Sequence, residues 1–256
     1  MKSVFIALFI CLLGTSYAAL AQQDDLFGTV KVAETHKGWI IGANGNFDIP
    51  AADMAKEFGL STRIGPSVLY KTKDNWMFGV KADFIFGAQV HPDSFMINLK
   101  DKYGEFITEG GARVTIPTNE RGYMIGLQAG KIVNTSKNSK DNGILFMTTV
   151  GFIQHKIQIN NPDGVPALNT TYQKGYDRLT NGLFIEESIE YSYFAKSGLL
   201  NFHIGPDIML ASTQDRRDYL FDVMRPDTKQ RLDVLFGIRG GWYFCIFKRK
   251  SEDILF

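Results

Sequence analysis

The sequence predicts an all-β fold, an eight-stranded antiparallel transmembrane β-barrel with short periplasmic turns and long extracellular loops. Two observations lead to this prediction. Eight segments alternate apolar and polar residues with a period of two, which is typical of strands with one apolar face. The connections between them alternate long and short, as expected when loops lie on one side of a membrane and turns on the other.

The segment 76–87 shows the alternation most clearly. Trp76, Phe78 and Val80 begin its apolar face, whereas Lys81 and Asp83 lie on the opposite face. The other predicted strands are 39–49, 63–71, 123–130, 144–159, 182–193, 200–210 and 231–244. The long loops are predicted at 50–61, 89–120, 160–178 and 212–230, and residues 112–116 leave open an extra pair of strands in the second loop.

A soluble β-sandwich also has period two, but its polar face would be rich in Lys, Thr, Ser and Glu. Here the polar face combines single charges with many of the 25 glycines. Several apolar faces also begin or end with Trp or Tyr, where a membrane barrel has its aromatic belt. The predicted belt consists of Trp39, Tyr70, Trp76, Tyr123, Tyr191 and Trp242.

The first residues resemble a cleaved secretory signal. A basic start, the apolar run 4–13 and the sequence Ala19-Leu20-Ala21 predict cleavage after Ala21 and hence export. The predicted organisation is a signal peptide at 1–21, a periplasmic segment at 22–35, the barrel at 36–247 and a periplasmic tail at 248–256. Cys245 would be the one cysteine after cleavage, so no disulfide framework is expected. The formal net charge of +1 suggests no nucleic-acid partner.

The polar faces point into the predicted barrel, whose interior is only wide enough for side chains to fill. Charges of both signs fall there, and buried charges need partners. We therefore predict a network that plugs the lumen, with a narrow small-solute pore as an alternative. The predicted network consists of Arg63, Lys81, Asp83, Glu186, Glu190, His203, Asp207, Asp233 and Arg239.

Enzymatic chemistry has little support in the sequence. His203 lies four residues before Asp207 on the same face, a spacing that would suit a general base and its orienting carboxylate. No nucleophile motif accompanies them, and no spacing of Cys or His indicates a metal site. We predict no catalytic residue, no metal and no cofactor. The alternative is a lipid-modifying or hydrolytic barrel enzyme that uses His203.

Two features suggest a protein partner. Glu187 falls on the apolar face of its strand, so either a bulge turns it inward or this strand faces a partner instead of lipid. The loop residues Tyr219, Leu220 and Phe221 would form an unusually apolar exposed tip.

The chain resembles the small outer-membrane β-barrel proteins of the Bacteroidetes type, the outer membrane protein beta-barrel domain family. The resemblance rests on the processing site Ala21-Gln22 and on the segments KTKDNWMFG (71–79), GFIQHKI (151–157), 174–182 and RLDVLFGIRGGW (231–242). It implies a location in the cell outer membrane, contact with its lipid and no catalytic residues. By analogy, it suggests an accessory subunit of a protein assembly or secretion machine.

Overall fold

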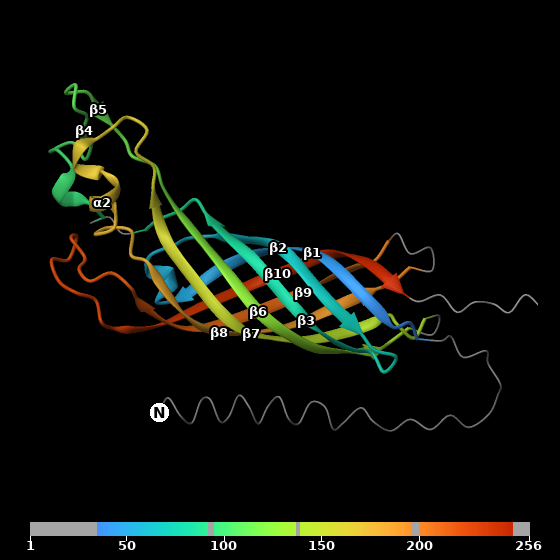
Figure 1. Ribbon diagram of the computed structural model, residues 1–256. Coiled ribbons are helices and arrows are strands. Elements are labelled where there is room, and N and C mark those ends of the chain that lie inside the picture. The colour runs from blue at the N-terminus through green and yellow to red at the C-terminus, as the bar shows by residue number, and fades with distance from the viewer. Residues whose placement is uncertain (1–34, 92–94, 137–138, 196–199, 248–256) are drawn as a thin grey trace, which may run out of the picture. The chain divides into compact units, whose positions relative to one another are not determined.

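Eight long antiparallel strands close into a barrel in the computed structural model, which describes residues 35–91, 95–136, 139–195 and 200–247 (Figure 1). The barrel strands are β1 (Gly38–Ala52), β2 (Ser61–Lys71), β3 (Trp76–Gly87), β6 (Thr118–Asn134), β7 (Gly143–Ile159), β8 (Thr180–Tyr193), β9 (Phe202–Asp215) and β10 (Gln230–Phe247). Their order around the ring is β1-β10-β9-β8-β7-β6-β3-β2. The predicted fold class is confirmed.

The first and last strands close the ring. β1 pairs with β10 in a continuous antiparallel register from Gly38–Phe247 to Ala52–Asp233. Closure pairs the edges that an open sheet would expose. Four long connections extend from one end of the barrel, at 53–60, 88–117, 160–179 and 216–229. Three short connections join strands at the other end. We call these the loop end and the turn end.

The strands run further than the sequence predicted. β6 begins at Thr118 and pairs with β7 as far as Ile159, well before the predicted start at Tyr123. Its first residues, Thr118 to Arg121, are all polar. A strand shows no apolar–polar alternation where both of its faces meet polar surroundings. The alternation could therefore not predict this part of β6.

The long connections contain a few short elements. These are η1 (Met54–Lys56), η2 (Ile97–Leu99), β4 (Phe106–Ile107), β5 (Arg113–Val114), η3 (Pro166–Leu168) and α2 (Thr170–Gln173). β4 and β5 pair as a separate two-stranded sheet, so the extra strand pair left open at residues 112–116 is present in the second long loop, and it adds no strand to the barrel. β4, β5 and α2 all lie beyond the same end of the barrel (Figure 1).

The barrel is apolar outside and charged inside. Large apolar side chains such as Phe47 and Leu183 are 75% and 71% exposed on the outer face, whereas Arg63 is fully buried in the interior. A water-soluble protein buries its apolar faces and exposes its charges. The reversed distribution is the one that lipid around a barrel requires.

The interior is layered along the barrel axis. An apolar cluster at the turn end includes Met77, Leu145 and Tyr243. A larger apolar cluster towards the loop end includes Ile85 and Ile153 and continues into the loops. The same order of apolar, charged and apolar residues recurs along individual strands, as in β3 with Met77, then Lys81 and Asp83, then Ile85.

In the part of the chain that the structure describes, no helix is long and apolar enough to cross a membrane. The predicted signal peptide and the tail at 248–256 lie outside the described residues, as does the predicted segment 22–35 except for residue 35.

Candidate functional site

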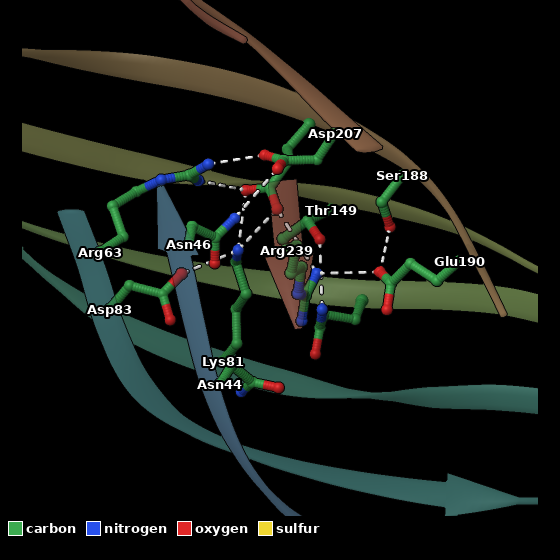
Figure 2. A network of polar contacts seen from close by, with 12 residues as sticks. Asn44, Asn46, Arg63, Lys81, Asp83, Thr149, Ser188, Glu190, Asp207 and Arg239 are labelled. Carbon is green, nitrogen blue, oxygen red and sulfur yellow. Dashed lines mark hydrogen bonds and ion pairs between the residues drawn. The ribbon is translucent and has the colours of Figure 1, made fainter. Parts of the chain in front are cut away.

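The centre of the lumen holds one connected network of ion pairs (Figure 2). Arg63 from β2 contacts three carboxylates, with 2.7 Å from Nε to Asp48 Oδ2, 3.0 Å from Nη1 to Glu186 Oε2 and 2.6 Å from Nη2 to Asp207 Oδ2. All of these side chains are buried. β1, β2, β8 and β9 each contribute to this cluster, so it joins distant parts of the ring.

Glu186 links the three cationic side chains of the network. Besides Arg63, its carboxylate accepts from Lys81 Nζ at 2.7 Å and lies 3.4 Å from Arg239 Nη1. Lys81 also binds Asp83 at 2.8 Å, and Arg239 lies 3.7 Å from Glu190. A buried charge is stable only where partners replace its hydration, and these contacts supply them.

Five carboxylates meet three cationic side chains in this network, namely Asp48, Asp83, Glu186, Glu190 and Asp207 against Arg63, Lys81 and Arg239. Side chains other than Arg and Lys provide further hydrogen bonds. Asn46 Nδ2 donates to Asp207 Oδ1 at 3.1 Å, and Ser188 Oγ donates to Glu190 Oε1 at 2.5 Å. Such bonds offset part of the cost of burying carboxylates in excess.

His203 lies buried among the polar side chains of the lumen. Its Nδ1 lies in a short contact with Glu190, its Nε2 lies 3.1 Å from Asn44 Oδ1, and its ring stacks on Tyr243 with centroids 4.5 Å apart. Asp207 instead binds Arg63 and Asn46. The pairing of His203 with Asp207, which only the enzyme alternative would need, is therefore not formed, and His203 instead contacts Glu190, another residue of the predicted lumen network.

Asp233 also lies apart from the central network. Its Oδ2 is 3.1 Å from His155 Nε2 and accepts a hydrogen bond from Thr213, in a buried cluster nearer the loop end. Glu120 accepts a short hydrogen bond from Ser61 in the same region of the lumen. Placing Asp233 in one network with Arg239 was wrong, since an apolar residue, Leu235, lies between them on β10.

Several lumen residues were missed by the sequence reasoning. Asp48 falls on the inward face of the predicted strand 39–49, so the alternation alone could have identified it. His155 had no such signal, because β7 is apolar on both faces over much of its length. Asp141, in the turn before β7, binds Lys71 at 2.6 Å and His36 at 2.6 Å, and only the folded chain brings these three together.

Glu187 faces outward. β8 pairs with β7 and β9 without a bulge there, with Thr148 and Ile208 opposite Glu187, so the expected inward turn is wrong. Thr148 Oγ1 donates to Glu187 Oε2 at 2.9 Å. On the same face of β8, Leu183 and Ile189 are 71% and 52% exposed, which makes this pair a polar spot in an apolar surface.

The loop segment 219–221 is not an exposed apolar tip. Leu220 is 2% exposed, and Phe221 packs against Tyr172 and Tyr176 with ring centroids 5.7 and 5.5 Å apart. Tyr219 is 39% exposed, and Phe221 is partly buried. The expected exposed tip is wrong. The backbone amide of Phe221 donates to the carbonyl of Gly175, and this hydrogen bond holds the segment against the 160–179 connection.

The predicted belt residues all lie on the outer face. Trp39 packs edge-on against Tyr70 with centroids 5.2 Å apart, and Trp76 begins β3 directly after the neighbouring turn. Tyr191 and Trp242 also lie near the turn end. Tyr191 is two residues before Tyr193, the last residue of β8, and Trp242 lies opposite Phe202, the first residue of β9. Tyr123 lies nearer the loop end, 6.5 Å from Phe152.

Known proteins add the following. No protein-family model and no curated protein matches the chain. Among solved structures, the attachment invasion locus protein Ail of Yersinia pestis, in complex with the heparin analogue sucrose octasulfate, is 10% identical with a TM-score of 0.44, covering 82% of this chain and 100% of that one. Neisserial surface protein A is 9% identical with a TM-score of 0.43, covering 82% and 99%. The outer membrane protein OprG from Pseudomonas aeruginosa is 12% identical with a TM-score of 0.33, covering 85% and 100%.

In the described residues, no group of three or more His, Cys, Asp or Glu side chains could hold a metal ion. The lumen network and the outward Glu187–Thr148 pair are two features that a functional proposal must explain.

Proposed function

We propose that this chain is an integral β-barrel of the cell outer membrane with a sealed lumen, which acts without catalysis as a structural or binding subunit of an outer-membrane complex. The complex would be one for protein assembly or secretion. The proposal includes export by a signal peptide cleaved after Ala21, long loops on the extracellular side and both barrel ends of the chain in the periplasm. It also includes kinship with the Bacteroidetes-type barrels, which rests on the segment resemblance alone.

The outer surface supports the membrane part of the proposal. Exposed Ile, Leu, Val and Phe side chains cover the outer faces of the barrel strands, with Trp and Tyr near the turn end. Contact with lipid would remove this large apolar area from water, which is energetically favourable. Lipid is the partner that can cover all sides of a closed barrel at once.

The layered interior supports a sealed lumen in preference to a pore. An ion moving along the axis would have to pass an apolar layer, the ion-pair network and a second apolar layer. Apolar constrictions resist the entry of ions because ions lose hydration there. The pore alternative is therefore the weaker one.

The enzyme alternative has lost its main support. A hydrolase would need His203 beside a nucleophile and an orienting carboxylate. Glu190 could orient the ring through Nδ1, but Nε2 faces the amide oxygen of Asn44, which is not a nucleophile, and all three side chains are buried.

One observation carries the role as a subunit: the carboxyl group of Glu187 lies on the outer face, midway along β8. Its Oε1 is buried and has no hydrogen-bond partner among the described residues. A carboxyl group facing lipid is unfavourable, less so for Glu than for Lys or Arg. A protein partner with a hydrogen-bond donor at this height would remove the cost once the Glu187 side chain turned outward and brought Oε1 to the surface.

A photocrosslinking residue next to Glu187 tests the proposal. The crosslinker would replace Ile189 on β8 or, as a control, Ile64 on β2, which lies on the opposite side of the ring and is similarly exposed, 55% against 52%. In native membranes we expect a discrete protein adduct from position 189 and none from position 64. Glu187→Leu should abolish the adduct. If both positions label only lipid, the role as a subunit is wrong.

A further inference from the structure

Three loops enclose a pocket of about 300 Å³ at the loop end of the barrel. Its walls come from the 53–60 connection, from Arg178 just before β8 and from the 216–229 connection with the start of β10. The proposed role as a subunit makes no use of this pocket.

Two arginines and a shared carboxylate form the inner part of the pocket. Glu57 Oε1 lies 3.1 Å from Arg178 Nη1 and 2.7 Å from Arg231 Nη1. Each arginine has a second carboxylate partner, Asp222 for Arg178 and Asp227 for Arg231. The side chains of Glu57, Arg178 and Arg231 are only 8%, 12% and 10% exposed. This inner part is charge-paired, so it is held in place before any ligand arrives.

The backbone supports this view of a fixed inner wall. Arg178 and Met224, which precedes the pocket residue Arg225, adopt left-handed φ values of 46° and 53°. This conformation is unfavourable for a residue with a side chain and persists only where surrounding contacts enforce it. Burial acts to lower the pKa of Arg178, but Asp222 and Glu57 outweigh it and hold the pKa above its usual value. Arg178 therefore stays charged.

The rim of the pocket carries an excess of positive charge. Lys56 and Lys229, whose side chains are 70% and 68% exposed, share the single carboxylate of Asp53, at 2.6 and 3.8 Å. Arg225 is exposed on the same rim. Three cations thus face the carboxylates of Asp53 and Asp227 where a ligand would enter, and a tetrahedral oxyanion is the group that such lysines and arginines bind.

The rest of the lining suits a sugar. The carboxylates of Glu57 and Asp227 can accept hydrogen bonds from hydroxyl groups, and Val223, which is 42% exposed, provides an apolar wall for the C–H face of a ring. The volume also exceeds what a bare oxyanion needs. We infer that this pocket binds a sugar that carries a phosphate or sulfate monoester, with the anion at the Lys56–Arg225–Lys229 rim and the hydroxyl groups inside.

Calorimetric titration of the whole folded protein in detergent tests this inference. The probes are glucose 6-phosphate, glucose 6-sulfate, glucose and inorganic phosphate. We expect one or both sugar esters to bind at least tenfold more tightly than glucose and than inorganic phosphate, and more weakly as salt rises. The two ester arms tell phosphate from sulfate. Equal binding of glucose would overturn the anion site, and equal binding of inorganic phosphate would overturn the sugar.

Variants locate the site. Arg225→Gln with Lys229→Gln removes two exposed rim charges and should weaken ester binding at least tenfold. Lys102→Gln with Arg113→Gln removes the same charge from the region of β4 and β5, outside the pocket, and should change it twofold or less. Both proteins should keep the gel migration of the folded barrel, because these side chains lie in loops. Equal weakening by the two pairs, or no ester binding by the parent protein, would overturn the inference.

Discussion

Arg63 and Asp48 form a two-pronged ion pair across β1 and β2, with Nε–Oδ2 and Nη2–Oδ1 distances of 2.7 Å each. Both side chains have zero exposure. The pair leaves Nη1 of the guanidinium free to reach Glu186 on β8, so one residue joins neighbouring and distant strands. Arg63 is therefore the central cation of the lumen.

Arg63→Met should destabilise the barrel strongly. The change keeps most of the side-chain volume but leaves Asp48, Asp207 and Glu186 without their shared cation. Removing one member of a buried ion pair costs about 3–5 kcal/mol. Urea unfolding of the protein in lipid vesicles, followed by tryptophan fluorescence, would measure the loss in the free energy of unfolding. Arg113→Met, in a loop and 52% exposed, is the control and should change it by less than about 0.5 kcal/mol.

The adjacent residues Glu186 and Glu187 should respond in opposite ways to the same substitution. Glu186→Leu removes the carboxylate that links Lys81, Arg63 and Arg239, and should lower the free energy of unfolding by about 3–5 kcal/mol. Glu187→Leu replaces an outward carboxyl group by an apolar side chain, and it should raise the free energy of unfolding by about 1–2 kcal/mol in vesicles. The same vesicle assay measures both, and a loss of stability in Glu187→Leu would contradict the outward placement.

Gly237 should tolerate no larger side chain. A Cβ atom there would lie 2.3 Å from Asp48 Oδ1 and 2.7 Å from Asp207 Oδ1, and both of these carboxylates are held by Arg63. Gly237→Ala should cost about 1–3 kcal/mol through overpacking. Gly240→Ala is the matched control on the same strand, because the nearest atom would be 3.5 Å away. Thermal unfolding of the two variants should differ clearly, and equal midpoints would contradict the close packing at Gly237.

The barrel could be predicted from the sequence because its two faces meet such different surroundings. Trp76 to Gly87 shows both faces without ambiguity, since lipid selects one and the charged lumen the other. Where lipid contact ends, as at the start of β6, the pattern ends too. The inward face of each strand could therefore be read, but only between the limits of the apolar band.

Partners across the lumen could not be predicted in the same way. Alternation says that His203 and Asp207 point inward, but which carboxylate each cation or imidazole meets depends on strand stagger and side-chain length. Thus His203 meets Glu190, whereas Asp207 meets Arg63. The pocket was missed because its charged residues come from three loops, none of which has a period that a sequence can reveal.

Acid should loosen the contact between η1 and β10. The hydrogen bond from Lys56, followed by that from the Leu232 backbone amide, lowers the pKa of Asp53 below its ordinary value of 3.8. A lowered carboxyl pKa means that the stabilisation is present above the ordinary value and is lost as pH falls through the lowered one. The Leu232 amide should therefore keep its protection from hydrogen exchange, measured against its intrinsic exchange rate, above pH 3.8 and lose it as pH falls below that value.

The Lys56→Gln variant provides the comparison. It removes the largest cause of the lowered pKa of Asp53, so the loss of protection at Leu232 should begin at a higher pH than in the parent protein. Lys102→Gln, remote from Asp53 in sequence and outside the pocket, should leave the pH of onset unchanged. An unchanged onset in Lys56→Gln would show that this ion pair does not control the contact.

The protein should conduct little or no current across a planar bilayer. Met77 and Leu145 belong to the apolar layer at the turn end and Ile85 and Ile153 to the one towards the loop end, so an ion would have to leave water twice. Between the layers, cations and carboxylates hold one another by contacts of about 3 Å, and a passing ion would have to break them. Recordings from correctly folded protein, verified by its gel migration, should show no stable unitary steps, and rare openings should disappear as misfolded protein is removed. Steady cation-selective steps in every preparation would show that the excess of carboxylates lines an open path, and the sealed lumen would then be wrong.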